Sequence, residues 1–321
     1  MRKIAFNCNQ TKKQGLGHFF RCLNLAKHMS ILRNCNIYFL GEFSSFSNKI
    51  LNELGFKIIK VNSKKAIETY IDDFDILITD RYDIDQDYLN FLANNKETKK
   101  VFIDDFNVLD FTQQDLVINF RVGASAFNYN SKDYALGPEY FIYTPILSKI
   151  RMNYKFRNDV NLVLFYGTST NQSNSFFMKL PQYLIKTYKN INVIHLTNHL
   201  SFFKHKRYKT INLNPDIEKH FETADIIING GGLIKYEAAF CGIPSATLST
   251  TIEQHEDTLV LEKENLLYNL GCQTNAEKIN LEEKLNCFIQ DSVLRQSLYE
   301  EGRKFFKPRS ITNLINKINE L

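Results

Sequence analysis

The sequence lacks the features that mark several common classes of protein. Its six cysteines form no C-x-x-C pair, so the spacing offers no zinc site, and their mostly apolar neighbours predict buried free thiols in a reducing compartment. No apolar run approaches the roughly 20 residues of a membrane-spanning helix. The opening MRKIAFNCN is too short and too polar for a signal peptide. We therefore expect a first strand there, no metal, no cofactor, no membrane span and a cytoplasmic location.

The chain also lacks a concentrated basic surface. Its net charge is +5, but the lysines are scattered and the acidic residues are equally dispersed. This distribution argues against nucleic-acid binding and suits a small anionic ligand. With 321 residues, 44% of them hydrophobic and 23% charged, the chain has the composition of an ordinary globular protein of two domains.

Short apolar strands alternate with helical patterns along the whole chain, which is typical of parallel α/β sheets. The proline and the charged residues of 143–161 interrupt this alternation, and it restarts afterwards. We therefore predict two Rossmann-like domains, residues 1–150 and 151–321, with parallel sheets facing across a cleft. Doubly wound sheets bind ligands at the carboxyl ends of their strands.

The segment ADIIINGGGLIKYEAAFCG predicts a buried strand, three glycines and a helix. Glycines let backbone amides approach a ligand closely, and a helix N-terminus favours an anion, so a diphosphate would fit. Glu237 on the helix would accept hydrogen bonds from ribose hydroxyls. A tight turn without any ligand is the alternative. A second polar loop, YGTSTNQS, follows another strand of the same domain. The predicted nucleotide-binding residues are Gly167, Thr168, Gly231, Gly232, Leu233, Tyr236, Glu237, Gln254 and His255.

The segment GLGHFFRCLNLAKHM places His18 behind Gly15 and Gly17, at the start of a helix predicted to run to about Leu32. The positive end of the helix dipole disfavours protonation, so His18 would be a neutral general base. A histidine that only bonds its own loop is the alternative. Arg21 would reach the cleft or pair with Asp80.

Other polar residues of this half have less specific patterns. Tyr82 would orient water or sugar, or be structural. We expect Asp104 and Asp105 to bond loop backbone, and His28 to lie at the surface.

The glycine-rich segment resembles the nucleotide-binding half of MurG-type GT-B glycosyltransferases. GLGHFFR, ILITDRYDID, VFIDDF, DLVINF, ALGPEYFIY and FYGTSTNQS occur in the order seen in PseG-like hydrolases of UDP-2,4-diacetamido-2,4,6-trideoxy sugars, which act in pseudaminic acid biosynthesis. The resemblance implies a GT-B-like fold, a catalytic role for His18 and Tyr82, and UDP release by water without a metal. The residues that it places near the substrate are Asn7, Gly15, Gly17, Arg21, Asp80 and Arg81.

The sequence departs from that family on the sugar side. Asn7 stands where an arginine is usual, and the D-H-Y of the family becomes Asp80-Arg81-Tyr82. Two alternatives to a hydrolase therefore stay open, a GT-B glycosyltransferase that uses a UDP-sugar donor and an inactive nucleotide-sugar-binding protein. A UDP-sugar is the expected small-molecule partner, and we favour a monomer.

Overall fold

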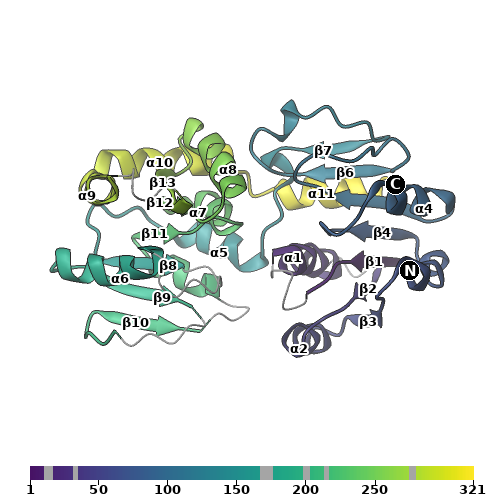
Figure 1. The fold of residues 1–321 in the computed structure, drawn as a ribbon, viewed down its shortest axis with the longest axis horizontal. Helices are drawn as coiled ribbons and strands as arrows, with labels where there is room; N and C mark the ends of the chain where they lie inside the picture. The colour runs from purple at the N-terminus through teal and green to yellow at the C-terminus, as the bar shows by residue number, and fades with distance from the viewer. Residues whose placement is uncertain (11–16, 32–34, 167–175, 198–202, 213–216, 275–279) are drawn as a thin grey trace. The chain divides into compact units, whose positions relative to one another are not determined.

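The computed structural model describes the chain except residues 11–16, 32–34, 167–175, 198–202, 213–216 and 275–279 (Figure 1). It contains two compact units. The first unit comprises Met1–Pro145 and Pro308–Leu321, and the second comprises Ile146–Lys307.

The first unit is built on a parallel sheet of seven strands in the order β3-β2-β1-β4-β5-β6-β7. Its strands are β1 (Arg2–Asn7), β2 (Cys35–Gly41), β3 (Lys57–Lys60), β4 (Ile76–Thr79), β5 (Lys99–Ile103), β6 (Leu116–Asn119) and β7 (Tyr134–Leu136). Its helices are α1 (Gly17–Ile31), α2 (Ser45–Glu53), α3 (Lys64–Glu68), α4 (Gln86–Asn94) and α11 (Ser310–Asn319), with 3-10 turns at Ile71–Asp73, Ala124–Ala126 and Pro138–Tyr140.

The second unit has a parallel sheet of six strands in the order β10-β9-β8-β11-β12-β13. Its strands are β8 (Leu162–Tyr166), β9 (Asn192–Leu196), β10 (Tyr208–Ile211), β11 (Ile226–Asn229), β12 (Ser245–Ser249) and β13 (Tyr268–Cys272). Its helices are α5 (Pro145–Asn153), α6 (Phe176–Thr187), α7 (Ile234–Cys241), α8 (Ile252–Lys263), α9 (Leu281–Gln290) and α10 (Ser292–Phe305), with a 3-10 helix at Ile217–Thr223. Both sheets reverse their strand order after the first strand, which is the Rossmann arrangement.

The last helix corrects the predicted domain boundary. The joint predicted at 143–161 contains α5 and the break between the units at Pro145. The sequence had placed everything after residue 150 in the second domain, but α11 belongs to the first. The Ser310 hydroxyl donates to the Phe141 carbonyl at 3.0 Å, and Lys317 pairs with Asp133 at 2.8 Å. The chain therefore returns to its first unit after completing its second.

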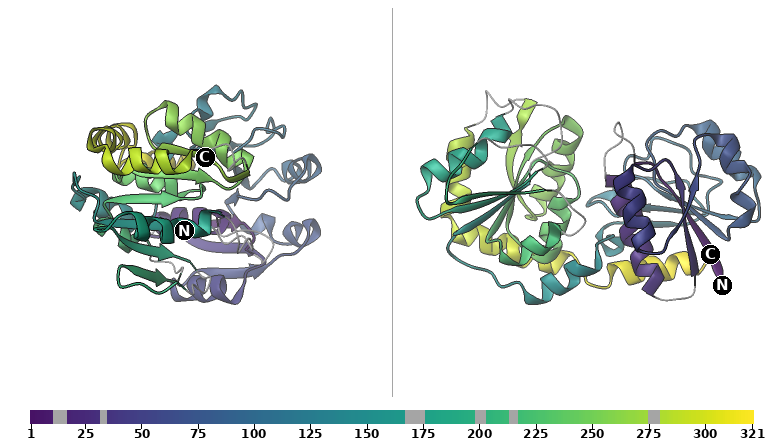
Figure 2. Two further views of the ribbon diagram at one scale, coloured as in Figure 1. Left: turned by 60° about the vertical axis from the view of Figure 1, so that its left-hand side comes forward. Right: turned by 90° about the horizontal axis from the view of Figure 1, so that it is seen from below.

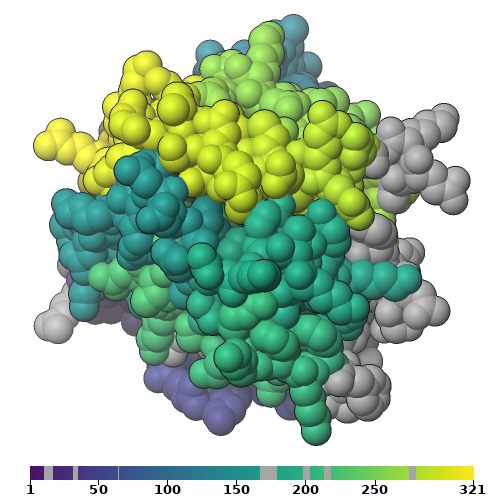
Figure 3. All heavy atoms as spheres, turned by 90° about the vertical axis from the view of Figure 1, so that its left-hand side faces the viewer, coloured from purple at the N-terminus to yellow at the C-terminus, as the bar shows by residue number. Residues whose placement is uncertain are grey.

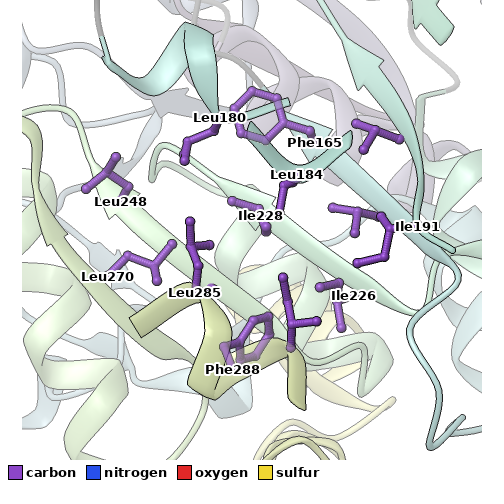
Figure 4. Close-up of a cluster of buried hydrophobic side chains, with 14 of the residues drawn as sticks. Phe165, Leu180, Leu184, Ile191, Ile226, Ile228, Leu248, Leu270, Leu285 and Phe288 are labelled. Carbon is purple, nitrogen blue, oxygen red and sulfur yellow. The ribbon is translucent and has the colours of Figure 1, made fainter. Parts of the chain in front are cut away.

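Helices cover both faces of each sheet (Figure 2). In the second unit, aliphatic side chains of β8, β11, β12 and β13 meet those of α6 and α9, with Ile228 near the centre of the cluster (Figure 4). The C-terminal helices α9 and α10 form the yellow band on one face of this unit (Figure 3). Each fully buried Leu, Ile or Phe contributes roughly 1.5–3 kcal/mol to stability. Such packing fixes the strand ends from which the polar loops emerge.

The central strands β4 and β11 are buried along their whole length, as their apolar runs predict. All six cysteines are free, and four of them are buried. Cys287 is exposed and Cys35 is partly buried. Within the described ranges, no helix combines the length and hydropathy needed to span a membrane.

Candidate functional site

Polar side chains of the first unit gather where the strand order reverses, between β1 and β4. β4 ends at Thr79 and is followed by Asp80, and β5 ends at Ile103, shortly before Asp105. His18 is the second residue of α1, which follows β1. Parallel strands present their carboxyl ends at one edge of the sheet, so these segments meet there.

His18 is bound to Asp80. The Nδ1 atom of the imidazole lies 2.6 Å from Oδ1 of Asp80, whose side chain is fully buried, while 15% of the histidine side chain is exposed. The same carboxylate accepts two hydrogen bonds from the guanidinium of Arg21, each of 2.6 Å. The predicted pairing of Arg21 with Asp80 is therefore confirmed.

Arg21 also binds a second carboxylate. Its NH1 group donates to both oxygens of Asp105, at 2.9 and 3.0 Å. The hydroxyl of Tyr82 donates to Asp105 at 2.5 Å, and the tyrosine ring meets the His18 ring edge-on at a centroid distance of 4.1 Å. These five side chains close a ring of contacts, and we call them the His18 cluster.

The charges of the His18 cluster explain its arrangement. Burial alone would raise the pKa of Asp80 and Asp105, but the Arg21 guanidinium, together with the contact of His18 with Asp80 and the hydrogen bond of Tyr82 to Asp105, outweighs burial and lowers both pKa values. Burial likewise opposes the charge of Arg21, and the two carboxylates more than compensate, so its pKa is raised. Two carboxylates against one guanidinium leave a net charge of −1 beside the imidazole.

The carboxylate of Asp80 also determines the tautomer of the neutral imidazole. An ionised carboxylate only accepts hydrogen bonds, so the proton of neutral His18 lies on Nδ1. The lone pair is then on Nε2, to which no side chain of the described residues donates. This arrangement is suited to accepting a proton from a nucleophile.

The remaining candidates of the first unit occupy different positions. Asn7 is fully buried, donates to the Tyr88 hydroxyl at 2.5 Å and accepts from Arg81 at 3.3 Å. Arg81 also pairs with Asp83 at 2.6 Å. Gly17 begins α1, and Gly15 lies outside the described residues. Their contact with a substrate stays a prediction.

In the second unit, the predicted glycine loop follows β11. The side-chain oxygen of Asn229 accepts from the Gly231 amide at 3.0 Å and from the Thr247 hydroxyl at 3.1 Å. Gly231 has φ +109°, and a Cβ atom there would lie 2.9 Å from Oε1 of Gln254. The positive φ would strain any other residue, and an added Cβ would also displace the Gln254 side chain, so the loop favours glycine here.

The glycine loop packs against Gln254, and hydrogen bonds fix the residues around it. The Gln254 oxygen accepts from the Thr250 hydroxyl at 2.6 Å. The buried Lys235 ammonium pairs with Asp257 at 2.7 Å, and the Tyr236 hydroxyl donates to the same carboxylate at 2.6 Å. The two contacts with Asp257 connect the first turn of α7 to α8. Tyr236 is only 2% exposed, so it supports the loop from the interior.

Glu237 lies in the first turn of α7 and is partly buried. Burial, with a further contribution from the charge of Glu218, raises its pKa to about 8. Burial and the same carboxylates raise the pKa of Tyr166, at the end of β8, to about 12. Gly167 and Thr168 follow Tyr166 and lie outside the described residues.

Three further nucleotide-binding candidates are Gly232, Leu233 and His255. Leu233 is partly buried at the N-cap position of α7, with no side-chain capping bond, and exposed Gly232 precedes it with φ +75°. The Nδ1 atom of His255 is buried without a hydrogen-bond partner among the described residues. Gly232 and Leu233 are positioned for a ligand at the N-terminus of α7, and a nucleotide contact of His255 stays a prediction.

Two expectations from the sequence need correction. His28 was expected at the surface, but its Nε2 lies 2.9 Å from the Tyr143 carbonyl, and burial lowers its pKa. Asp105 was expected to bond loop backbone and instead binds Arg21. Asp104 does bond the loop, accepting from the amides of Phe106 and Asn107.

Several residues that support the loop, such as Asn229, Lys235 and Asp257, were not predicted from the sequence. No pattern in the sequence singles them out. In the part of the chain that the structure describes, no group of three or more His, Cys, Asp and Glu is placed to hold a metal.

Comparisons with known proteins identify the fold. No protein-family model matches the sequence. The uncharacterized protein MJ1062 of Methanocaldococcus jannaschii is 29% identical over 280 residues, which are 79% of this chain and 57% of that protein. The chain therefore spans little more than half of that relative.

Several solved structures superimpose on almost the whole chain. MurG of Acinetobacter baumannii has a TM-score of 0.69 at 13% identity and covers 100% of both chains. MnaA of Staphylococcus aureus with UDP has a TM-score of 0.64 at 12% identity, covering 99% of this chain and 96% of that one. UGT89C1 of Arabidopsis thaliana with UDP-L-rhamnose has a TM-score of 0.68 at 12% identity, covering 99% and 98%. The predicted GT-B fold of two Rossmann-like units is therefore confirmed.

Proposed function

We propose that this protein is a nucleotide-sugar hydrolase that breaks the anomeric C–O bond of a UDP-linked diacetamido-trideoxy sugar, as the resemblance to PseG-like proteins implies. The observation that carries the proposal is the contact of His18 with Asp80, which keeps Nε2 as the basic nitrogen. The structures of MnaA with UDP and of UGT89C1 with UDP-L-rhamnose support UDP as the nucleotide.

In the proposed reaction, Nε2 of His18 takes a proton from water while the water oxygen bonds to the anomeric carbon. The bond from that carbon to the diphosphate oxygen breaks, and UDP leaves with the electron pair. Asp80 stabilises the imidazolium that forms, as in other carboxylate–histidine pairs.

The UDP part is assigned to the second unit. Backbone amides at Gly231, Gly232 and the start of α7 would hold the diphosphate, because the N–H groups of a helix start have no partners within the helix. Holding the negative charge there makes UDP a better leaving group.

Replacement of His18 tests the proposal. His18→Ala should lower UDP release from UDP-sugars by a factor of about 10²–10⁴, the usual contribution of a general base, and leave the Kd of UDP within threefold. His205→Ala, at an exposed histidine of the second unit, is the control. Undiminished turnover by His18→Ala would refute the mechanism.

A GT-B glycosyltransferase is the second candidate, favoured by the structural likeness to MurG and to UGT89C1 with UDP-L-rhamnose. A transferase would release UDP only when a hydroxyl acceptor is added. A hydrolase releases UDP and free sugar in water alone, so NMR of both products over a panel of UDP-sugars separates the two. Tight binding without any product would indicate an inactive binding protein.

A further inference from the structure

Tyr82 combines high exposure with a fixed position. The residue is 59% exposed, yet its hydroxyl donates to Asp105, which Arg21 holds with two further hydrogen bonds. The partly buried hydroxyl and the adjacent carboxylate raise the pKa of Tyr82. The proton therefore stays between the two oxygens, and what Tyr82 presents to solvent is mainly its ring.

A second exposed ring lies next to Tyr82. Phe106, in the loop after β5, is 41% exposed, and its centroid is 5.4 Å from that of Tyr82. The Arg121 guanidinium lies over the Phe106 ring at 5.6 Å and donates to the Asp105 backbone carbonyl at 2.8 Å. A cation–π contact of this kind stabilises the position of an exposed ring by a small free energy, about 0.5–1 kcal/mol.

Single exposed apolar side chains are common on protein surfaces, but neighbouring rings held in place beside a polar cluster indicate a ligand. Tyr82 contacts His18 edge-on at 4.1 Å, so whatever covers these rings also lies next to the imidazole. A pyranose has one face made mainly of C–H groups, which packs against aromatic rings. In a UDP-sugar, the diphosphate lies between the uracil nucleobase and the anomeric carbon of the sugar. Because His18 is proposed to act at that carbon, the group beside His18 is the sugar.

We propose that Tyr82 and Phe106 form a platform that binds the C–H face of the sugar ring and places its anomeric carbon beside His18. Tyr82 then contributes a ring surface and exchanges no proton with the substrate. Since the platform determines which sugars fit, deoxy sugars with few hydroxyls on that face should bind best. The inference rests on the proposed function, because it assumes a UDP-sugar as the ligand.

Steady-state kinetics with UDP-sugars and inhibition by UDP test the platform. Phe106→Ala should raise KM about tenfold, which corresponds to about 1.4 kcal/mol of lost stacking, with kcat within threefold and the Ki of UDP unchanged. Tyr82→Leu should raise KM at least as much. Tyr134→Leu is the matched control, because Tyr134 is 53% exposed in the same unit and lies in β7.

Tyr82→Phe separates the ring from its hydroxyl. It should keep KM within threefold and kcat within tenfold, with an unchanged basic limb of the pH profile. If Tyr82→Phe instead loses kcat and the basic limb of the pH profile disappears, then Tyr82 exchanges a proton during the reaction. This result would overturn the proposal. A Ki of UDP that rises together with KM would place the nucleobase on the platform, and an unchanged KM in Phe106→Ala and Tyr82→Leu would show no platform.

The proposed function can fail separately from the platform. If the unmodified protein releases no UDP from any UDP-sugar, the hydrolase assignment fails. Calorimetry can then still compare the Kd of a UDP-sugar with the Kd of UDP. Phe106→Ala should weaken the binding of the UDP-sugar and leave the binding of UDP unchanged. Equal effects on both ligands would overturn the platform.

Discussion

Asp80→Asn should show how the His18 cluster works, because asparagine keeps the shape of the side chain and removes its charge. In the protein, the two oxygens of Asp80 accept two hydrogen bonds from Arg21 and one contact from His18. Asparagine has a single acceptor oxygen, so one N–H group of Arg21 or the ring of His18 faces an amide N–H instead.

The first expected consequence is a loss of stability. Asp80 is fully buried and Arg21 is 5% exposed, so solvent screens this pair little. Breaking such a buried pair from one side costs about 3–5 kcal/mol. In the variant, the carboxylate of Asp105 still compensates part of the charge of Arg21, so we expect a loss near the lower end, about 3 kcal/mol. For a domain of this size, about 3 kcal/mol lowers Tm by roughly 10 °C.

The second consequence is a loss of turnover. At an effective dielectric constant of about 20, charges about 4 Å apart attract each other by about 4 kcal/mol. A full imidazolium charge would therefore cost about 10³-fold in rate without Asp80, and a half-developed charge in the transition state about 30-fold. We expect kcat to fall by between about 30-fold and 10³-fold.

Release of UDP, measured well below the Tm of the variant, gives the rate. The Kd of UDP from calorimetry should change less than threefold, because the nucleotide is assigned to the second unit. Asp83→Asn is the control, since Asp83 lies on the same loop and pairs with Arg81 at an exposed position. A folded Asp80→Asn protein with kcat within threefold of the parent would refute the role assigned to the carboxylate.

Three further predictions concern both units. Gly231→Ala should raise the Kd of UDP at least tenfold, whereas Gly232→Ala, which has open space around its Cβ position, should affect it less in calorimetry. Because Asp105 has a pKa below its unfolded value, it stabilises the protein above about pH 4 and loses this effect as the pH falls through the lowered pKa, so Asp105→Asn should flatten the acidic fall of Tm. Glu237 has a pKa raised to about 8, so its contribution is lost as the pH rises towards that value, and Glu237→Gln should raise Tm at pH 9 more than at pH 5.

Much of the fold could be predicted from the sequence because local patterns determine it. The apolar run of β11 predicted a buried strand, and the helix predicted from His18 to about Leu32 is α1, Gly17–Ile31. The course of the last helix could not be predicted this way. The amphipathic pattern of α11 shows that it packs on something, but not that its partner is the first unit.

The chemistry of the site was predicted only in part, because its contacts join distant positions. Arg21 is separated from Asp80 by 59 positions and from Asp105 by 84. The first pairing follows from the strand order: α1 begins shortly after β1, and β1 pairs in parallel with β4, which ends just before Asp80. Asp105 was misjudged because two adjacent aspartates after a strand look alike in sequence, and only the fold shows which one faces Arg21.

The two units use one strand order for different chemistry. At the reversal point of the first sheet, charged side chains from three segments surround an imidazole. At the corresponding point of the second sheet, a glycine loop presents backbone amides, accepts support from the buried side chain of Asn229 and packs against the partly buried Gln254. Backbone amides suit the constant part of a nucleotide sugar, the diphosphate, because their N–H groups bind negatively charged phosphate oxygens in a fixed geometry. Side chains suit the variable part, because they can change without altering the backbone. The departures from the PseG-like pattern at Asn7 and Arg81 are changes of side chain in the first unit, at the end of β1 and shortly after β4.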